Sequence, residues 1–383
     1  MHTDGQAPIA LYLHIPFCKS KCAYCDFASY AGREEAMARY CSFLVQELAD
    51  TGAACGAPPV GSVFLGGGTP TLLSGAQVAA LLAAARAAFR VLPGAEMTME
   101  GNPGTLTLEA LSACRAAGIN RLSLGAQAAQ GALLAALGRI HRWADVAEGV
   151  AMARAAGFEN LNLDLMFGLP GQTMADWLET LAAAVALAPA HISCYGLQVE
   201  EGTPLAARLA AGEGAPLPDE DAERAQYDAA LRVLAQARYA QYELSNFARP
   251  GAACRQNLTY WTCGEYLGVG CAAHSHWAGE RWGNTAALDD YMAAMAARRS
   301  PVAERTTVTE ADARFERMML GLRLTRGVEV AAFARRFGCT PQQVWGDVLD
   351  GLVRQGLLAE ADGYLRLTRR GMDVQNTVLT ALL

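Results

Sequence analysis

The sequence predicts an α/β fold, a partial (β/α)6 barrel followed by a smaller α+β domain. First, six short apolar runs alternate with alanine- and leucine-rich helical stretches over the first two-thirds of the 383 residues. Strand–helix repetition at this spacing implies right-handed βαβ units and a parallel sheet. Second, the apolar runs read as continuous rather than alternating, which is typical of strands buried on both faces. Third, the pattern changes near Thr307 to helices and a hairpin.

The barrel elements follow in order along the chain. The expected strands are Ala10–Ile15, Ser62–Leu65, Glu96–Glu100, Arg121–Leu124, Asn160–Leu165 and His191–Leu197. The expected helices between them are Glu34–Thr51, Gly75–Phe89, Thr107–Ala117, Trp143–Ala156 and Met174–Ala186. We therefore expect a barrel domain over residues 1–205.

Beyond the barrel, the sequence predicts an extension over residues 206–300 and a last domain over 301–383. The extension begins with a Gly- and Pro-rich connection, Gly202–Asp219. A helix over Glu220–Ala237 and a strand over Gln241–Phe247 follow, and then an irregular section runs to about Asn284. The last domain contains helices Glu310–Leu322, Val328–Phe337 and Pro341–Gln355, then a hairpin of Leu358–Glu360 and Leu365–Leu367. Three helices and a hairpin are typical of a winged helix.

The composition excludes several classes of protein. Hydrophobic residues make up 52% and charged residues 18%, which is globular rather than disordered. A net charge of −7 argues against broad binding to nucleic acid. No segment is apolar and long enough to span a membrane, and no basic region precedes an apolar run at the N-terminus. Eleven cysteines, most of them single, favour a reducing cytoplasm over a disulfide framework.

The strongest chemical signal is Cys18-Lys-Ser-Lys-Cys22-Ala-Tyr-Cys25, which directly follows the first strand. Three thiolates can ligate three irons of a 4Fe–4S cluster and leave the fourth iron open to another ligand. The alternative is a structural zinc ion with His14 as its fourth ligand. The spacing alone does not decide between these two.

Polar or glycine residues end every later strand of the predicted barrel. Each of them, taken singly, is more often a turn, a helix cap or a solvent contact. Together they form a ring at the face where barrel enzymes build their sites, which a zinc knuckle does not need. The members are Gly66–Pro70, Glu100, Asn102, Gln127, Asp164 and the segment Tyr195–Gln198.

At this point the sequence resembles a known family. Tyr12-Leu-His-Ile-Pro-Phe-Cys18-x3-Cys22-x2-Cys25-x-Phe27 is similar to the opening motif of radical S-adenosylmethionine (SAM) enzymes, and within them to the HemW group of haem chaperones. The resemblance covers nearly the whole chain. It continues through Phe64–Thr71, Glu100–Pro103, Leu122–Gln127, Leu137–His141, Asn162–Gln172, Tyr242–Pro250 and Leu367–Leu379.

The resemblance implies a [4Fe–4S] cluster, bound SAM and a set of residues around them. Tyr12 would contact SAM beside the cluster, and Tyr24 lies between the cluster ligands. Gly67, Gly68 and Thr69 would hold the methionine amino group. Glu100, Gln127, Arg139 and Asp164 would hold the carboxylate, the ribose and neighbouring groups, and Gln198 would lie near the adenosine.

Two departures from the oxygen-independent coproporphyrinogen III oxidases favour the HemW group. That enzyme has a fourth cysteine where this chain has Phe27, and it has a longer extension before the cluster motif. The resemblance then implies binding of haem or porphyrin, an electron donor and a haem-accepting client, including a transient membrane-protein client. The alternatives are an oxidase-type enzyme that decarboxylates a porphyrinogen, and a winged-helix regulator with a redox-sensing cluster.

The haem ligand is the point at which the chain departs from the HemW pattern. These proteins usually carry His-Asn-x-x-Tyr-Trp, whereas this chain has Gln256-Asn257-Leu-Thr-Tyr260-Trp261. A glutamine cannot replace an imidazole as a strong iron ligand. Nearby cysteines and histidines could substitute. His274 matches a family motif and is the best single candidate, whereas Cys254, Cys263 and Cys271 are expected to be small buried residues.

Overall fold

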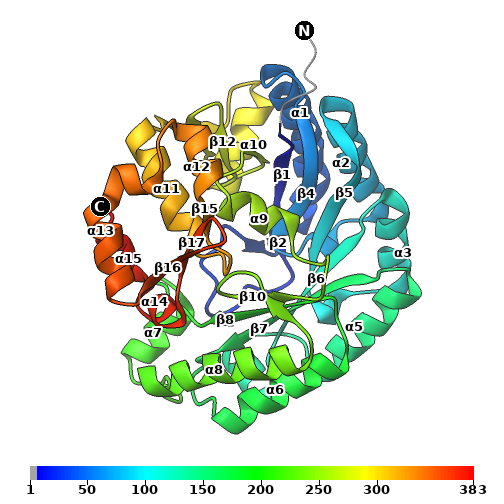
Figure 1. Cartoon of the computed structure of the whole chain (residues 1–383). Helices are drawn as coiled ribbons and strands as arrows, with labels where there is room; N and C mark the ends of the chain where they lie inside the picture. The colour runs from blue at the N-terminus through cyan, green and yellow to red at the C-terminus, as the bar shows by residue number, and fades with distance from the viewer. Residues whose placement is uncertain (1–6) are drawn as a thin grey trace.

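A computed structural model describes residues 7–383 and confirms the predicted α/β barrel class. Six parallel strands curve around a central space in the order β1-β4-β5-β6-β7-β8 (Figure 1). They are β1 (Ile9–Ile15), β4 (Pro59–Gly67), β5 (Arg90–Gly101), β6 (Arg121–Gln127), β7 (Asn160–Phe167) and β8 (His191–Gly196). All six expected strands are therefore present, each near its predicted position. They form the parallel part of a 12-stranded sheet.

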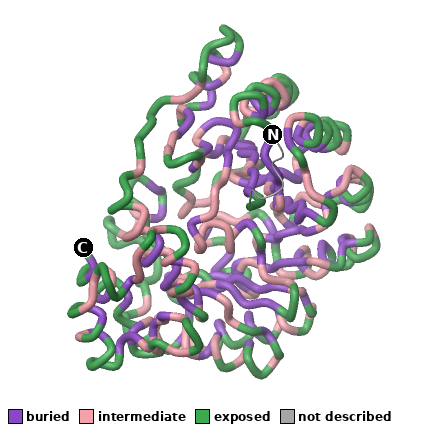
Figure 2. Tube along the Cα trace, turned by 45° about the horizontal axis from the view of Figure 1, so that its top comes forward, coloured by how far each residue is buried: buried purple, intermediate pink, exposed green. Residues whose placement is uncertain are grey.

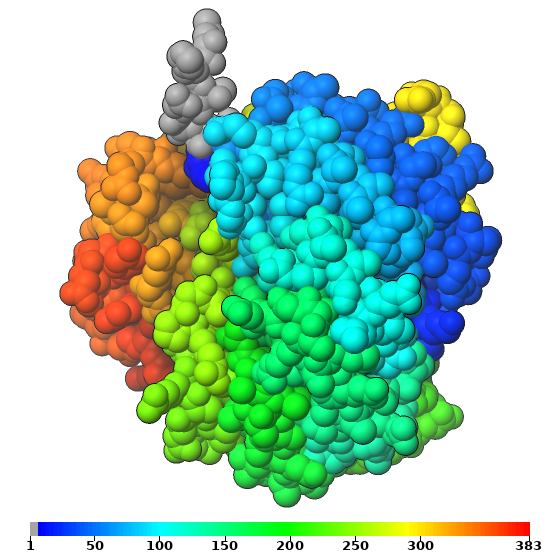
Figure 3. Space-filling model, turned by 90° about the vertical axis from the view of Figure 1, so that its right-hand side faces the viewer, coloured from blue at the N-terminus to red at the C-terminus, as the bar shows by residue number. Residues whose placement is uncertain are grey.

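Helices cover the outside of this arc (Figure 1), and Figure 3 shows the outer surface of one side, coloured in chain order from blue to green. Several of them begin at capping boxes that satisfy the free N–H groups of the first turn, such as Ser74 with Gln77 and Thr173 with Asp176. The covering helices are α1 (Met37–Ala54), α2 (Gly75–Ala88), α3 (Leu108–Ala117), α5 (Trp143–Ala155), α6 (Met174–Ala186) and α8 (Glu220–Gln236). Short helices α4 (Gly131–Ala136) and α7 (Pro204–Ala210), 3-10 turns Glu34–Ala36, Pro70–Leu72 and Pro103–Thr105, and strands β2 (Phe17–Cys18) and β3 (Tyr30–Ala31) complete this part.

The barrel strands alternate in chemistry, which corrects the expectation of continuous apolar runs. Both faces are buried, as the purple strands in Figure 2 show. Leu122 and Leu124 of β6 belong to the main hydrophobic core, whereas Arg121 and Ser123 bond to polar side chains of β7. The interior of the barrel is therefore polar, unlike the apolar layers that fill a closed (β/α)8 barrel. A polar interior is suited to ligands.

The extension contains more regular structure than the sequence suggested. The strand expected over Gln241–Phe247 is wrong as one element, because the chain forms two short strands, β9 (Ala240–Gln241) and β10 (Asn246–Ala248). The section expected to be irregular holds α9 (Arg255–Trp261), β11 (Tyr266–Val269), β12 (His274–Trp277) and β13 (Glu280–Asn284). Strand β11 adds to β1 in parallel, and β12, β13 and β14 (Val302–Thr307) extend the sheet antiparallel. Helix α10 (Leu288–Ala296) lies between β13 and β14 in the chain.

The C-terminal part has a hydrophobic core of its own and the expected winged-helix elements. Phe333, Leu349 and Leu365 are central to this core. The expected helix over Val328–Phe337 starts two residues late, because Val328 and Glu329 form an unpredicted strand, β15. The elements are α11 (Glu310–Gly321), β15, α12 (Val330–Phe337), α13 (Pro341–Arg354), β16 (Leu358–Ala361), β17 (Tyr364–Leu367), α14 (Arg369–Asp373) and α15 (Gln375–Thr380).

The two parts are joined by polar contacts rather than by a shared core. Arg281 of β13 forms an ion pair with Glu316 of α11. Glu243 and Leu324 form an isolated β-bridge. Over residues 7–383, no helix has both the length and the apolar character that a membrane span needs.

Candidate functional site

The three cysteines of the motif lie on a partly exposed loop after β1. Cys18 ends β2, which pairs in parallel with β3. Each thiol has a polar neighbour from the protein. Thr69 Oγ1 donates to Cys18 Sγ at 3.6 Å, and Arg139 Nη1 donates to Cys22 Sγ at 3.4 Å. Ser29 Oγ lies 3.9 Å from Cys25 Sγ. The loop therefore presents three free thiols that the surrounding elements already orient.

Ala23, in the middle of this loop, fixes it to two short helices. Its N–H donates to the carbonyl of Leu137 at 2.9 Å, and its carbonyl accepts from the N–H of Leu205 at 2.8 Å. Ala23 and Tyr24 also pack on a small apolar cluster that includes Leu134. The cysteine loop is thus held from both sides before any metal arrives.

His14 holds the loop and is not free to act as a fourth zinc ligand. Its Nε2 donates to the carbonyl of Ala28 at 2.8 Å, and its Nδ1 accepts from the Tyr12 hydroxyl at 3.1 Å. Burial lowers the pKa of the imidazole, so the ring is neutral and this tautomer satisfies both nitrogens. Over residues 7–383, no three His, Cys, Asp or Glu side chains converge closely enough to chelate a single metal ion. The zinc hypothesis gains no support from this geometry.

The glycines at the end of β4 allow the cysteine loop to approach that strand closely. Gly67 has φ +109°, and a Cβ there would lie 2.3 Å from the His14 ring. A Cβ on Gly68 would lie 2.6 Å from the carbonyl oxygen of Phe17. The backbone of this turn also bonds to the ring of polar side chains, since the Gly67 N–H donates to Glu100 Oε2 at 3.0 Å. The absence of side chains brings the loop, the turn and Glu100 together.

Glu100 and Asp164 are two half-buried carboxyl groups on the interior side of the barrel. Burial, followed by the charge of Asp164, raises the pKa of Glu100 to about 7. Asp164 instead accepts from Ser123 Oγ at 2.8 Å and from Asn162 Nδ2 at 2.9 Å. Hydrogen-bond donors therefore surround the Asp164 carboxylate. The charged form of Glu100 is instead destabilised, and a nearby cation or hydroxyl would stabilise it.

Gln127 and Arg139 meet at the end of β6. Gln127 is buried and has φ +64°, a left-handed conformation that is rare for residues other than glycine and is concentrated at functional sites. Gly125 makes the space, because a Cβ there would lie 2.9 Å from Gln127 Nε2 and 3.0 Å from Arg139 Nη2. Arg139 Nη2 donates to the Gly125 carbonyl at 2.6 Å, but its Nε is buried without a partner among the described residues.

A polar network that was not predicted from the sequence lies behind Asp164. Asn162 joins Ser123, Ser193 and His191, whose Nδ1 donates to Asn162 Oδ1 at 2.6 Å. His191 Nε2 accepts from the Tyr242 hydroxyl at 3.0 Å. The signal was present in Asn160-Leu-Asn-Leu-Asp164, where every second residue is polar. The network fixes the Asp164 side chain through its neighbours.

Gln198 lies farther out than the rest of the ring. Its side chain is exposed and makes no hydrogen bond with the described part of the chain. Tyr195, two residues after the buried Ser193 on the same face of the strand, is 40% exposed. The role of Gln198 beside adenosine stays a prediction.

The residues present fit a three-cysteine cluster with a small polar ligand beside it. Three free thiols occupy the loop, and partial burial raises the pKa of the Cys18 and Cys25 thiols. Metal binding would therefore displace protons. The unpaired Arg139 Nε, the glycine turn and the two carboxyl groups provide donors and acceptors for an amino acid and a ribose.

Helix α9, which carries the residues aligned with the usual haem motif, lies in the central space in Figure 1. Gln256 is buried, and both ends of its amide are paired. Its Oε1 accepts from Ser62 Oγ at 2.9 Å, and its Nε2 donates to the Tyr260 hydroxyl at 2.7 Å. Trp261 stacks with Arg323, whose guanidinium carbon lies 4.8 Å from the ring centre. Gln256 thus joins α9 to β4 and is not available to a ligand.

His274 lies apart from Gln256, at the start of β12. It is exposed, and its ring covers Gly283, where a Cβ would lie 2.8 Å from the imidazole. Cys254, Cys263 and Cys271 are buried, as expected. Of these candidate iron ligands, His274 is the one that presents an exposed side chain.

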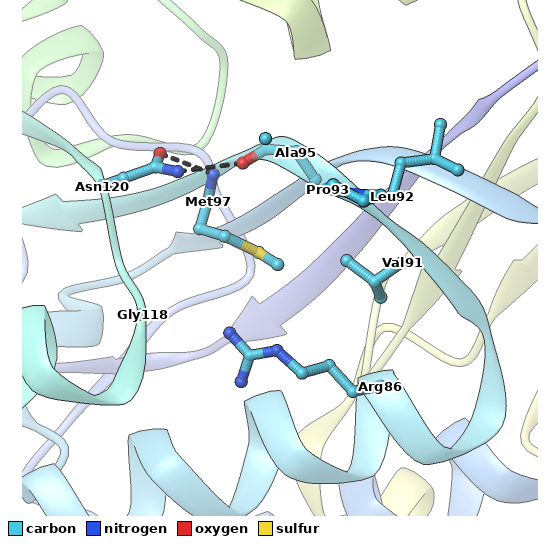
Figure 4. Close-up of a pocket in the computed structure, with 9 residues that line it drawn as sticks. Arg86, Val91, Leu92, Pro93, Ala95, Met97, Gly118 and Asn120 are labelled. Atoms are coloured by element: carbon cyan, nitrogen blue, oxygen red, sulfur yellow. Dashed lines mark hydrogen bonds between the residues drawn. The ribbon is translucent and has the colours of Figure 1, made fainter.

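A surface pocket of about 350 Å³ lies at the opposite end of β5 from Glu100 (Figure 4). Its polar side chains serve the fold. Arg86 donates to the Ala117 carbonyl at the end of α3, and Asn120 bonds to the backbone of Ala95 and Met97. With these groups paired, the pocket offers no chemistry.

Models of two known families match parts of this chain. The radical SAM superfamily model matches residues 12–184, and the HemN C-terminal domain model matches residues 308–374. The heme chaperone HemW of Bacillus subtilis (strain 168) is 36% identical over 97% of this chain and 98% of its own length. The heme chaperone HemW of Escherichia coli (strain K12) is 34% identical, with 98% of each chain covered.

Among solved structures, coproporphyrinogen III oxidase (HemN) from Escherichia coli has a TM-score of 0.85 and 23% sequence identity. The match covers 98% of this chain and 90% of that chain. At this identity the likeness shows the fold alone. The sequence relatives are closer, and they extend over the whole chain. The chain therefore belongs to the HemW family of the radical SAM superfamily.

Proposed function

We propose that this chain is a haem chaperone that carries a [4Fe–4S] cluster on Cys18, Cys22 and Cys25, with SAM bound beside it. Family membership supports the pair of cofactors. The observation that carries the proposal is the set of groups left without partners around the thiols. Chief among them is the buried Arg139 Nε, on the side chain that also donates to Cys22. An unpaired buried donor costs about 1–3 kcal/mol, which a bound carboxylate would recover.

Each ring residue has a role in this proposal. Arg139 would bind the methionine carboxylate, and the turn of Gly67, Gly68 and Thr69 would bind the amino group. Glu100 and Asp164 would accept hydrogen bonds from ribose hydroxyls, with Gln127 and Gln198 nearby. Tyr12 and Tyr24 would flank the cofactors. Once bound and reduced, the pair supplies reductive cleavage of a carbon–sulfur bond and hydrogen-atom abstraction.

For haem, we propose a ligand other than residue 256. The Gln256 amide is engaged by Ser62 and Tyr260, so a role for α9 would be limited to its exposed edges and to Asn257, Tyr260 and Trp261. His274 offers an exposed imidazole, which suits an iron ligand on a protein that must also release its cargo. The client would be a haem-accepting protein, including one embedded in a membrane. The free thiols favour the cytoplasm as the site of this work.

The test is anaerobic reconstitution followed by haem titration of the parent, His274→Ala and Gln256→His. We expect the parent to bind haem, with at least tenfold weaker binding in His274→Ala. Gln256→His should not restore haem binding when it is combined with His274→Ala, because the side chain at position 256 is buried against Ser62 and Tyr260. A protein that assembles its cluster but binds no haem in any variant would contradict the chaperone proposal. Conversion of coproporphyrinogen to protoporphyrinogen would favour the oxidase alternative instead.

A further inference from the structure

The distribution of lysine in this chain is extreme. The chain has 31 lysine and arginine residues, and only two of them, Lys19 and Lys21, are lysines. Both lie between the first two cysteines of the cluster motif. Everywhere else a basic side chain is an arginine. The one place that keeps lysine is therefore the loop that surrounds the proposed cluster.

The two lysines lie on the outer side of that loop. Both are exposed, as is the intervening Ser20, whereas Cys18 and Cys22 are half-buried. Lys21 Nζ donates to the carbonyl of Phe27 at 3.0 Å, which closes the loop over Cys25. Lys19 makes no side-chain hydrogen bond with residues 7–383. One ammonium therefore braces the loop, and the other is directed to a partner or to water.

Phe27 adds an apolar contact to this surface. Its side chain is 61% exposed, more than any other large hydrophobic side chain of residues 7–383 except the terminal Leu383. The opposing charge within the loop is Asp26, and the next arginine along the chain, Arg33, is already paired with Asp289. The exposed surface of Lys19, Lys21 and Phe27, which we term the lysine edge, is a positive and apolar patch on a chain of net charge −7.

Lysine suits a brief encounter better than arginine does. The ammonium is a compact, strongly hydrated charge, whereas the guanidinium forms bidentate, partly desolvated pairs that hold a partner longer. Weak electron-transfer complexes use small interfaces, and charge complementarity raises their association rate more than their affinity. A docking surface that must release its partner after each electron would be expected to keep lysine.

We propose that the lysine edge is the docking surface for an acidic protein that carries one electron to the cluster. This inference rests on the proposed function, because it requires a cluster on the adjacent cysteines. The donor loses one electron, and the cluster passes from the 2+ to the 1+ state, with no proton or atom transferred. Acidic side chains of the donor pair with Lys19 and Lys21, and Phe27 contacts the rim of its redox group.

The scarcity of lysine makes the first test sharp. A flavodoxin, an acidic protein with a flavin, serves as the probe after its own amines are acetylated. Carbodiimide then joins its carboxylates only to amines of this chain, which are Lys19, Lys21 and the α-amino group. We expect a one-to-one product joined through Lys19 or Lys21 by peptide mass spectrometry, and its loss in 0.5 M salt. A product joined only through the α-amino group would overturn the proposal.

Three double variants separate charge from other effects. K19R/K21R keeps both charges but cannot be coupled by carbodiimide, so the product should vanish while docking remains. K19Q/K21Q should lose both the cross-linked product and the docking. R326Q/R354Q removes two exposed charges from the C-terminal domain and should behave like the parent.

Docking is read as the rate at which reduced flavodoxin bleaches the visible absorbance of the reconstituted cluster. K19Q/K21Q should lower this rate at least tenfold at low salt, K19R/K21R less than about threefold, and R326Q/R354Q not at all. Reduction by a photoreduced deazaflavin, a small reductant that needs no docking, should be equal in all four proteins. Unchanged flavodoxin rates in K19Q/K21Q would overturn the docking proposal. Failure of the parent to assemble a cluster would instead contradict the proposed function, while the cross-link would still report on docking.

Discussion

The ring at the strand ends and Gln256 of helix α9 are both polar sites of the barrel, but they differ in whether their polar groups are paired. In α9, Gln256 uses both ends of its amide within the protein. Beside the ring, Arg139 Nε has no partner among the described residues, and within the ring Glu100 holds a charge that its surroundings disfavour. Unpaired groups cost stability unless a ligand arrives. The difference indicates that the ring is built for a ligand and that Gln256 serves the fold.

The largest effect that sharpens this comparison is expected at the cysteines. Replacement of Cys22 by serine should abolish cluster assembly, because two thiolates cannot hold three irons. The visible absorbance and iron content of the anaerobically reconstituted protein measure this. Cys339→Ser, which removes a remote free thiol of similar exposure, is the matched control and should retain both signals. Normal iron content in Cys22→Ser would place the cluster elsewhere.

Ionisation of Glu100 should lower the stability of the ligand-free chain as the pH rises. The pKa of Glu100 is about 7 in the folded chain, above its ordinary value of 4.5. Between these values the folded chain binds more protons than the unfolded chain, so stability is full below pH 4.5 and falls as the pH rises through 7. Glu100→Gln should therefore stabilise the ligand-free chain at pH 8, by up to about 3 kcal/mol, and change little at pH 4.5.

Chemical denaturation at the two pH values measures this difference. Glu109→Gln, at an exposed position in the first turn of α3, is the control and should show no such pH dependence. A Glu100→Gln variant that is less stable than the parent at pH 8 would mean that the carboxylate is already well paired.

The next effect concerns SAM affinity. Arg139→Gln should weaken binding of SAM by roughly thirtyfold, because a hydrogen bond to a charged group contributes about 2 kcal/mol. Arg142→Gln, three residues along the chain, removes an arginine outside the ring. Equilibrium dialysis of SAM against the reconstituted proteins compares them. Equal affinities would show that Arg139 serves only the cysteine loop.

The smallest effect is expected in α9. A substitution there should lower the free energy of unfolding, whereas Glu100→Gln should raise it at pH 8. Gln256→Ala should lower the free energy of unfolding by about 1–2 kcal/mol, since it leaves Ser62 and Tyr260 without a buried partner. Asn257→Ala, one residue on, should change it by less than about 0.5 kcal/mol. Denaturant melts report both values. A stabilised Gln256→Ala would place α9 with the ring as a ligand site.

The sequence predicted the six barrel strands, the outer helices and the order of the ring, because buried strands and amphipathic helices have strong periodic signals. It also placed Cys18, Cys22 and Cys25 on one loop after β1. The polar interior was not predicted. Asn160–Asp164 indicates it, because polar residues alternate there with leucines, but the other strands are mostly apolar. Strands of two to five residues such as β10, β12 and β15 have too few positions for a period and depend on tertiary pairing. Contacts between distant segments, such as Gln256 with Ser62, leave no local signal.

The two backbone hydrogen bonds of Ala23 have a consequence for how iron would be acquired. They divide the stretch from Cys18 to Cys25 into two short arcs whose ends are fixed, so the loop loses its conformational entropy while the chain folds. The three thiols are then held on one ordered loop before iron binds. Loss of the cluster to oxygen would leave this loop in position. We expect repair to require only iron, sulfide and reductant, without unfolding of the barrel.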